Sequence, residues 1–163
     1  NPGKILSQIN AYLKRYLNKS DSLFQTQDGM DIACCKLDKE SLLLEIAGAT
    51  HCVYVIREGK LIELKGDKIT LGQDPYGREV DNFVVNKYQL EIDDIIYTFT
   101  DGLPDQIGGP RRKKFKVGAL KQLLIDISDY PLAKQKELIT NELSTWQGEN
   151  QQLDDILIMG VKV

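Results

Sequence analysis

The sequence predicts an α+β protein in which helices pack on the faces of sheets. Its predicted elements follow the order helix, several short strands, two helices and a final strand. Such segregated runs of strands and helices are typical of this class. Compact polar turns such as "LDKES" and "REGK" join apolar runs, which favours antiparallel pairing between strands that are neighbours in the chain.

Length and composition limit the possible functions. The 163 residues fit one domain, and a domain of this size buries roughly 70% of the surface of its unfolded chain. The net charge of −3 argues against a mainly electrostatic nucleic-acid binder. The chain has neither a long apolar run nor a basic-then-apolar leader, so we expect no membrane contact from this segment and a cytoplasmic location.

The first predicted element is an amphipathic helix over "PGKILSQINAYLKRYL". Pro2 suits its first turn, where a missing N–H is harmless. The apolar side chains at helical spacing are Ile5, Ile9, Tyr12, Leu13, Tyr16 and Leu17. We expect five of the aromatic residues to lie in the core, because each of them falls on an apolar face. These residues are Tyr12, Tyr16, Phe83, Tyr97 and Phe99.

A polar segment follows, and then a series of strand-like runs that we expect to form an antiparallel meander. The runs are Met30 to Leu37, Ser41 to Ala47, Cys52 to Arg57, and Lys60 to Leu64. Two further extended runs, joined through Asp93 and Asp94, lead from a long irregular stretch to Asp101.

The last part of the chain predicts two helices and a strand. Leu120, Leu123, Leu124 and Ile127 form a helical stripe after the Gly-Pro-basic loop "IGGPRRKKFK". A second helix is predicted over about Pro131 to Trp146. The final run, Ile156 to Val163, is nearly all apolar, as in a central strand with neighbours on both edges. Since the chain opens on a helix, we expect it to begin partway through a domain.

The cysteines and the single histidine limit the chemistry. Cys34, Cys35 and Cys52 lack the spacing of metal ligands, and we expect them to be reduced core residues. A redox role for the adjacent Cys34 and Cys35 is disfavoured, because neighbouring strand residues point to opposite faces. With His51 alone, a cage of several histidines is excluded.

Carboxylates stand at the ends of two apolar strands. Asp101 leaves the run "IIYTFT", and Asp154 and Asp155 enter the run "ILIMGVKV". A rigid sheet can hold such groups while they reach solvent, which suits Mg²⁺ or Mn²⁺. Gly102 allows a sharp turn and a close backbone approach. Turns and caps use the same residues, so the spacing alone leaves both interpretations open.

The order of the motifs carries a family resemblance. The segment "YTFTDGLPDQIGGPRRKKFK" is followed by "WQGENQQLDDILIMGVKV", and is preceded by "DGMDIACCKLD" and "EIAGATHCVYVIREGKL". Together these resemble the carboxy-terminal part of bacterial metal-dependent serine phosphatases. Those phosphatases belong to the sporulation stage II protein E branch of the protein phosphatase type 2C superfamily. The resemblance covers essentially the whole chain.

The resemblance implies an antiparallel β-sandwich flanked by helices, in α-β-β-α layers. It identifies residues 1–163 as a single partial phosphatase domain that lacks its first strands. In relatives, those strands carry an Asp-Gly motif whose aspartate bridges two metal ions. The "DGM" of Asp28 to Met30 is not that motif, because it matches a segment downstream of the first helix.

The resemblance also implies a set of site residues around Mn²⁺ or Mg²⁺. Asp101 would bind one metal ion, and Asp154 would bind the same ion. Asp155 would replace Asp154 as the ligand or would support Asp154 from outside the ligand set. Gly102 would contribute its backbone to the metal site. Asp105 lies where many relatives place an acid near a weaker third metal. In this family a metal-bound water attacks the phosphoserine or phosphothreonine ester, and no covalent phosphoenzyme is expected.

A basic cluster follows the TDG segment. Its residues are Arg111, Arg112, Lys113, Lys114 and Lys116. Arg111 or Arg112 would bind phosphate through a bidentate fork, or the cluster would guide an acidic phosphoprotein. The alternative is a solvated loop that balances local acids.

Two functional hypotheses follow from the sequence. The first is a metal-dependent protein-serine/threonine phosphatase fragment, impaired by itself, whose substrate is a regulatory phosphoprotein such as an anti-anti-sigma-like domain. The parent chain would carry an upstream sensor or response-regulator module. The second is a non-catalytic regulatory or protein-binding module with a degenerate phosphatase fold. An upstream Asp-Gly that enters a β-hairpin would favour the first.

Overall fold

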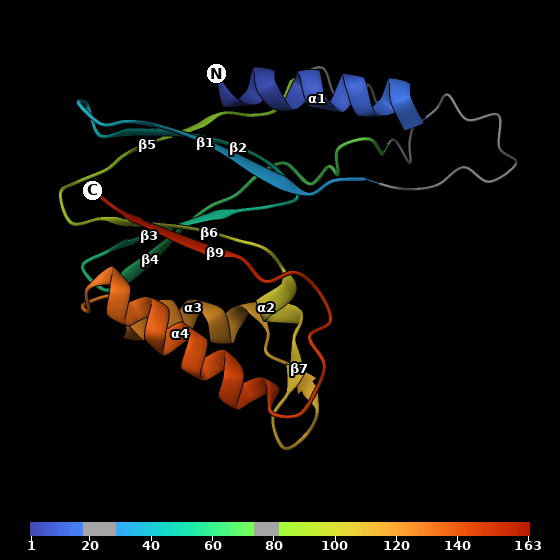
Figure 1. Cartoon of the computed structure of the whole chain (residues 1–163). Coiled ribbons are helices and arrows are strands. Elements are labelled where there is room, and N and C mark those ends of the chain that lie inside the picture. The colour runs from blue at the N-terminus through green and yellow to red at the C-terminus, as the bar shows by residue number, and fades with distance from the viewer. Residues whose placement is uncertain (18–28, 74–81) are drawn as a thin grey trace, which may run out of the picture. The chain divides into compact units, whose positions relative to one another are not determined.

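The computed structural model describes residues 1–17, 29–73 and 82–163, so Asp28 of the "DGM" segment lies outside the described residues (Figure 1). The chain divides into two compact units. The first contains Asn1–Val53 and Glu63–Glu91, and the second contains Tyr54–Ile62 and Ile92–Val163. Each combines helix with antiparallel sheet, which confirms the α+β prediction.

In the first unit a helix packs on a three-stranded antiparallel sheet. Helix α1 (Pro2–Leu17) lies against β1 (Ile32–Asp38) and β2 (Leu43–Ala49). The sheet order is β1-β2-β5, with β5 (Asn86–Gln89) on the other side of β2. Because both edges of β2 are occupied, the next strand of the chain cannot pair with β2.

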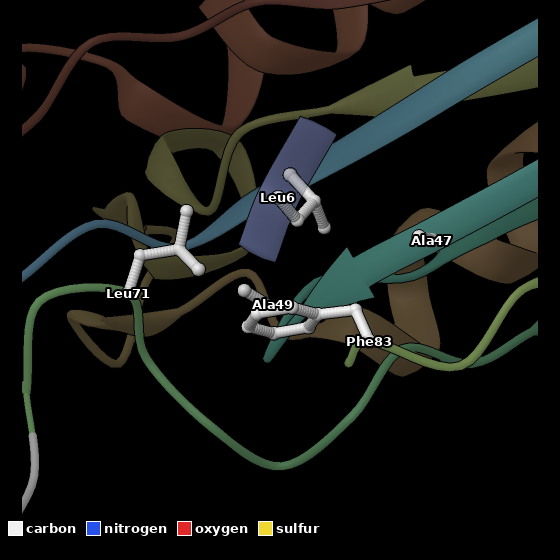
Figure 2. Packing of buried hydrophobic residues seen from close by; sticks show 5 residues of the cluster. All are labelled: Leu6, Ala47, Ala49, Leu71 and Phe83. Carbon is white, nitrogen blue, oxygen red and sulfur yellow. The ribbon is translucent and has the colours of Figure 1, made fainter. Parts of the chain in front are cut away.

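The core of this unit lies between α1 and the end of β2. Figure 2 shows Leu6, Leu71 and Phe83 around Ala49, and Ala47 and Ala49 present small side chains to the helix. Leu6, Ala47 and Ala49 are fully buried. Small residues on the strand let the helix approach closely, so the apolar contacts are well packed.

In helix α1, the predicted burial of two tyrosines is wrong. Tyr12 and Tyr16 are 65% and 69% exposed and stack on each other with ring centroids 5.9 Å apart. The buried stripe runs through Leu6 and Asn10, with Ile9 and Leu13 beside it. The two tyrosines lie off this stripe, although their spacing is helical. Phe83, Tyr97 and Phe99 are buried as predicted.

A four-stranded antiparallel sheet in the order β4-β3-β6-β9 belongs to the second unit except for Val53, Glu63 and Leu64 at two strand ends. These strands are β3 (Val53–Arg57), β4 (Lys60–Leu64), β6 (Ile95–Phe99) and β9 (Ile158–Lys162). The predicted continuous meander is therefore wrong, because β2 pairs with β5 and β3 pairs with β6. The hairpins β1–β2 and β3–β4 form, but they belong to different sheets.

Three helices and a small hairpin complete the second unit. The helices are α2 (Gly102–Asp105), α3 (Val117–Asp126) and α4 (Leu132–Gln147). The hairpin consists of β7 (Ile107–Gly108) and β8 (Lys113–Lys114). Helices α3 and α4 match the two predicted helices, whereas α2 and the hairpin replace what the sequence presents as a loop.

Tyr97 of β6 connects the sheet to α4. Its hydroxyl group donates a hydrogen bond to the side-chain oxygen of Gln135, which is buried in α4. The Gln135 amide in turn donates to the carbonyl oxygens of Ser128 and Tyr130. Burial raises the pKa of Tyr97 to about 12. The polar groups of this contact are thus satisfied inside the unit.

Two further predictions need correction. Within the described residues β9 pairs with β6 alone and lies at an edge of its sheet, not at the centre. The cysteines are free as predicted, but Cys34 and Cys52 are only partly buried and Cys35 is exposed. For Cys34 and Cys35 the reason is that β1 is an edge strand with a solvated face. No helix in the described part of the chain could cross a membrane.

Candidate functional site

Asp101 stands where β6 ends and α2 begins. Its backbone carbonyl accepts the Asp105 N–H at 2.9 Å, so the main chain of Asp101 makes the turn. The side chain makes no capping hydrogen bond and is exposed. The carboxylate is therefore not needed for the turn, and it is available to a ligand.

The antiparallel pairing of β6 with β9 brings the second carboxylate segment to the same place. Phe99 is opposite Ile158, so the residues that leave β6 lie beside those that enter β9. The Thr100 N–H donates to the carbonyl oxygen of Leu157 at 2.9 Å. The Thr100 hydroxyl donates to the carbonyl oxygen of Asp155 at 2.7 Å and accepts the Leu157 N–H at 2.9 Å. One side chain thus joins both strand ends.

Gly102 makes this approach possible. A Cβ atom on Gly102 would overlap the carbonyl oxygen of Asp155 and would lie 3.0 Å from Cγ1 of Ile156. Any larger residue would push the start of α2 away from the Asp155 backbone. Glycine is thus required at position 102, because a side chain there would clash with the backbone of Asp155.

Gln106 holds the chain just before Asp154, and no feature of the sequence predicted this role. This side chain is fully buried. Its Nε2 donates to the Gln151 carbonyl at 2.9 Å, and its Oε1 accepts the Leu153 N–H at 3.4 Å. Its own carbonyl accepts bonds from the Phe115 N–H and from Trp146 Nε1, each at 3.0 Å. Gln106 therefore ties α2, the hairpin and α4 to the segment that carries the aspartate pair.

The two members of the aspartate pair differ in their local contacts. Oδ1 of Asp154 accepts the Asp155 N–H at 2.7 Å, and the Asp154 carbonyl accepts a bond from Gln152 Nε2 at 2.7 Å. Both aspartate side chains are exposed. The local turn thus orients the Asp154 carboxylate, while the Asp155 backbone is held by Thr100.

The remaining predicted residues lie on α2 and on the hairpin. Asp105 forms an ion pair with Lys114 of β8, with Oδ2 and Nζ 2.8 Å apart. Arg111 and Arg112 lie in the turn between β7 and β8, and their side chains are exposed. The structure therefore brings Asp101 and the aspartate pair to one strand end, and it places Asp105 against a cation of the hairpin.

The oxygen atoms at this strand end suit a hard divalent cation, but few side chains there could bind one. Carboxylates and backbone carbonyls are the donors that Mg²⁺ and Mn²⁺ prefer. In residues 1–17, 29–73 and 82–163, however, no three His, Cys, Asp or Glu side chains are grouped so that they could hold a metal ion. The role of Asp101, Asp154 and Asp155 as metal ligands therefore stays a prediction.

Comparisons with known proteins agree with this architecture. The family model described as stage II sporulation protein E (SpoIIE) matches residues 1–163. No curated protein matches by sequence. Among solved structures, the SiaA-PP2C domain of Pseudomonas aeruginosa is 26% identical with a TM-score of 0.84, and the match covers 100% of this chain and 61% of that chain.

Two more distant structures show the same fold. The phosphatase domain of the cell fate determinant SpoIIE from Bacillus subtilis has a TM-score of 0.60 and 15% identity over 97% of this chain and 63% of that chain. The RsbU and RsbW domains of Rv1364c from Mycobacterium tuberculosis have a TM-score of 0.63 and 18% identity over 91% of this chain and 39% of that chain. The chain spans about three fifths of the first two structures.

These matches confirm the predicted fold, which is that of PP2C-type phosphatase domains. The family model extends over every residue of the chain, including both strand ends that carry the candidate carboxylates. The resemblance seen in the motif order is therefore confirmed, and the chain belongs to the stage II sporulation protein E family.

Proposed function

We propose that this chain is part of a metal-dependent protein-serine/threonine phosphatase domain and that it supplies one side of the metal centre. The observation that carries the proposal is the joining of two carboxylate segments by Thr100 and Gly102. Asp101 leaves β6 and the aspartate pair enters β9 at one edge of a rigid sheet. The family match supports the reaction class.

Asp101 and Asp154 are proposed to bind the same Mn²⁺ or Mg²⁺ ion, with Asp155 as the alternative ligand. When bound, such a metal pair supplies an activated water and neutralises charge on the phosphoryl group. Thr100, Gly102 and Gln106 hold the two carboxylate segments at a fixed separation. Asp105 is proposed to lie near a weaker third metal, which would require its ion pair with Lys114 to open.

The proposed substrate is phosphoserine or phosphothreonine on a regulatory protein, such as an anti-anti-sigma-like domain. The matched structures support regulation as the setting, since one is named as a cell fate determinant. We propose an upstream sensor or response-regulator module, a cytoplasmic location and no nucleic-acid partner. Arg111 and Arg112 would contact the phosphate or the partner protein.

A non-catalytic module with the same fold is the second candidate. The observation that favours it is the small ligand count, because no three-ligand group exists in the described parts of the chain. A metal pair that lacks a bridging carboxylate would bind weakly, since the two cations repel each other. Residues 1–163 are proposed to form a single partial domain whose bridging Asp-Gly would lie upstream.

The test compares manganese-dependent hydrolysis of a phosphoserine peptide by this chain and by a chain extended upstream. Asp101→Asn and Asp154→Asn should each abolish the hydrolysis by the extended chain. Asp129→Asn, at an exposed position between α3 and α4, is the matched control and should retain it. An extended chain that stays inactive at saturating manganese, or aspartate variants that behave like the control, would contradict the phosphatase proposal.

A further inference from the structure

The hairpin β7–β8 concentrates positive charge in an otherwise acidic chain. We define the basic hairpin as residues 107–116. Its cations are Arg111, Arg112, Lys113, Lys114 and Lys116, and all five are exposed. The net charge of the chain is −3. Within the described residues, Lys114 has an ion-pair partner in Asp105, whereas Arg111, Arg112 and Lys113 have none.

This hairpin is fixed although its strands are very short. Two-residue strands are not stable alone, and here Trp146 of α4 holds them. Gly109 N–H donates to the Trp146 carbonyl at 2.8 Å, and a Cβ atom on Gly108 would overlap that same oxygen. Phe115 packs edge-on against the Trp146 ring with centroids 5.5 Å apart. The cations therefore project from a frame that α4 holds in place.

The backbone of the basic hairpin is also strained at two of the cationic residues. Arg112 has a φ of 46° and Lys116 has a φ of 77°, a region that residues with a Cβ atom rarely adopt. The Lys116 conformation is held by a bond from its N–H to the Pro104 carbonyl at 2.7 Å. Strain of this kind persists only where the surrounding structure enforces it, and it is typical of ligand-binding segments.

The position of the turn indicates what it can contact. Figure 1 shows the turn of the hairpin on the far side of α2 from the end of β6. The Lys116 N–H donates to the Pro104 carbonyl at 2.7 Å and joins the hairpin to α2, and the exposed ion pair between Asp105 and Lys114 lies beside this bond. A group bound at the Asp101 edge is therefore separated from the turn by the length of α2 and β7. An extended peptide advances about 3.3 Å per residue, so several residues would bridge this separation.

We propose that Arg111, Arg112 and Lys113 bind acidic residues that flank the phosphorylated residue of a protein substrate. This inference rests on the proposed phosphatase function. Guanidinium groups bind carboxylates through two parallel hydrogen bonds, and cations held in place lose less freedom on binding. The acidic residues contact the turn, several positions away from the phosphorylated residue. Without added metal, Lys114 remains paired with Asp105.

The test measures binding without hydrolysis. Two fluorescein-labelled phosphoserine peptides are compared by fluorescence anisotropy with no added metal: one carries three acidic residues in its flank, and the other carries glutamine there. The chain should bind the acidic peptide more tightly. The triple variant Arg111→Ala/Arg112→Ala/Lys113→Ala should bind the acidic peptide roughly tenfold more weakly and should not change binding of the glutamine peptide.

The control variant Lys4→Ala/Lys39→Ala/Lys60→Ala removes the same charge from exposed positions elsewhere. It should bind both peptides like the wild type, and circular dichroism should show that both variants are folded. Equal binding of the two peptides by the wild type, or equal losses in both triple variants, would overturn the inference. So would tighter binding of a single-stranded oligonucleotide that the hairpin variant loses. Selective peptide binding without hydrolysis by the extended chain would contradict the phosphatase proposal alone.

Discussion

The Thr100 hydroxyl donates a hydrogen bond to the backbone carbonyl of Asp155 at 2.7 Å, between segments that are far apart in the sequence. The same oxygen accepts the Leu157 N–H at 2.9 Å. Through these two bonds, a residue at the end of β6 determines where the chain enters β9. The spacing between Asp101 and the aspartate pair depends on this contact.

Replacement of Thr100 by valine should weaken the junction. Valine keeps the shape of the side chain but removes both hydrogen bonds, and we expect a loss of about 1 kcal/mol in the free energy of unfolding because water replaces part of them. Manganese affinity of the extended chain should also fall. Thr100→Ser retains the hydroxyl group and is the control. Urea denaturation and calorimetric titration with Mn²⁺ measure the two effects, and equal behaviour of both variants would refute the role of the hydroxyl.

Replacement of Gly102 by alanine should disturb the same junction sterically. The new Cβ atom would overlap the Asp155 carbonyl oxygen, and crowding of a packed contact costs about 1–3 kcal/mol. Gly118→Ala is the matched control, because no atom lies within 4 Å of its added Cβ and alanine favours the helix by up to about 1 kcal/mol. Thermal unfolding should shift down for the first variant and not for the second. The opposite order would contradict the packing described at Gly102.

Replacement of Gln106 by leucine should release the segment before Asp154. The substitution removes the partners of the Gln151 carbonyl and the Leu153 N–H at a buried site, with an expected cost of about 1–3 kcal/mol. Hydrogen exchange at Leu153 should become faster. Gln122→Leu, at an exposed position on α3, should leave that exchange rate unchanged. Unchanged protection of Leu153 in the Gln106 variant would show that other contacts hold the segment.

The titration of Tyr97 should make the second unit less stable at high pH. Burial raises its pKa to about 12, whereas the pKa of a tyrosine in the unfolded chain is about 10. A raised folded-state pKa contributes stability that is complete below pH 10 and is lost as the pH rises toward 12, up to roughly 2–3 kcal/mol. Tyr97→Phe should remove this dependence, although it also loses the bond to Gln135. Tyr130→Phe, at an exposed position, should retain it, as urea denaturation across this pH range would show.

The sequence predicted the elements better than their pairing. Local periodicity correctly indicated α1, α3 and α4, because helix formation depends on nearby residues. The strands were also found, but their distribution between two sheets depends on contacts between distant segments. That is why the meander was wrong. In α1, the spacing that suggested burial of Tyr12 and Tyr16 did not reveal that the stripe through Leu6 and Asn10 faces the sheet.

In the candidate site too, local features were predicted and contacts between distant segments were not. Asp101 and the pair Asp154 and Asp155 were found because strand ends are visible in the sequence. The contact made by Thr100 joins residues on opposite sides of α2, α3 and α4 in the chain, and the contact made by Gln106 joins residues on opposite sides of α3 and α4. A polar residue in an ordinary turn gives no local sign of such a partner. The assignment of metal ligands remains a prediction.

The pairing of Phe99 with Ile158 closes a loop that includes three helices and the basic hairpin. Separation of β9 from β6 would open this loop and carry the aspartate pair away from Asp101. A cation held by both segments would therefore stabilise the closed loop by mass action, in addition to any part it takes in chemistry. Hydrogen exchange in β9 should then slow as manganese is added, so the ion concentration would set how often this strand opens.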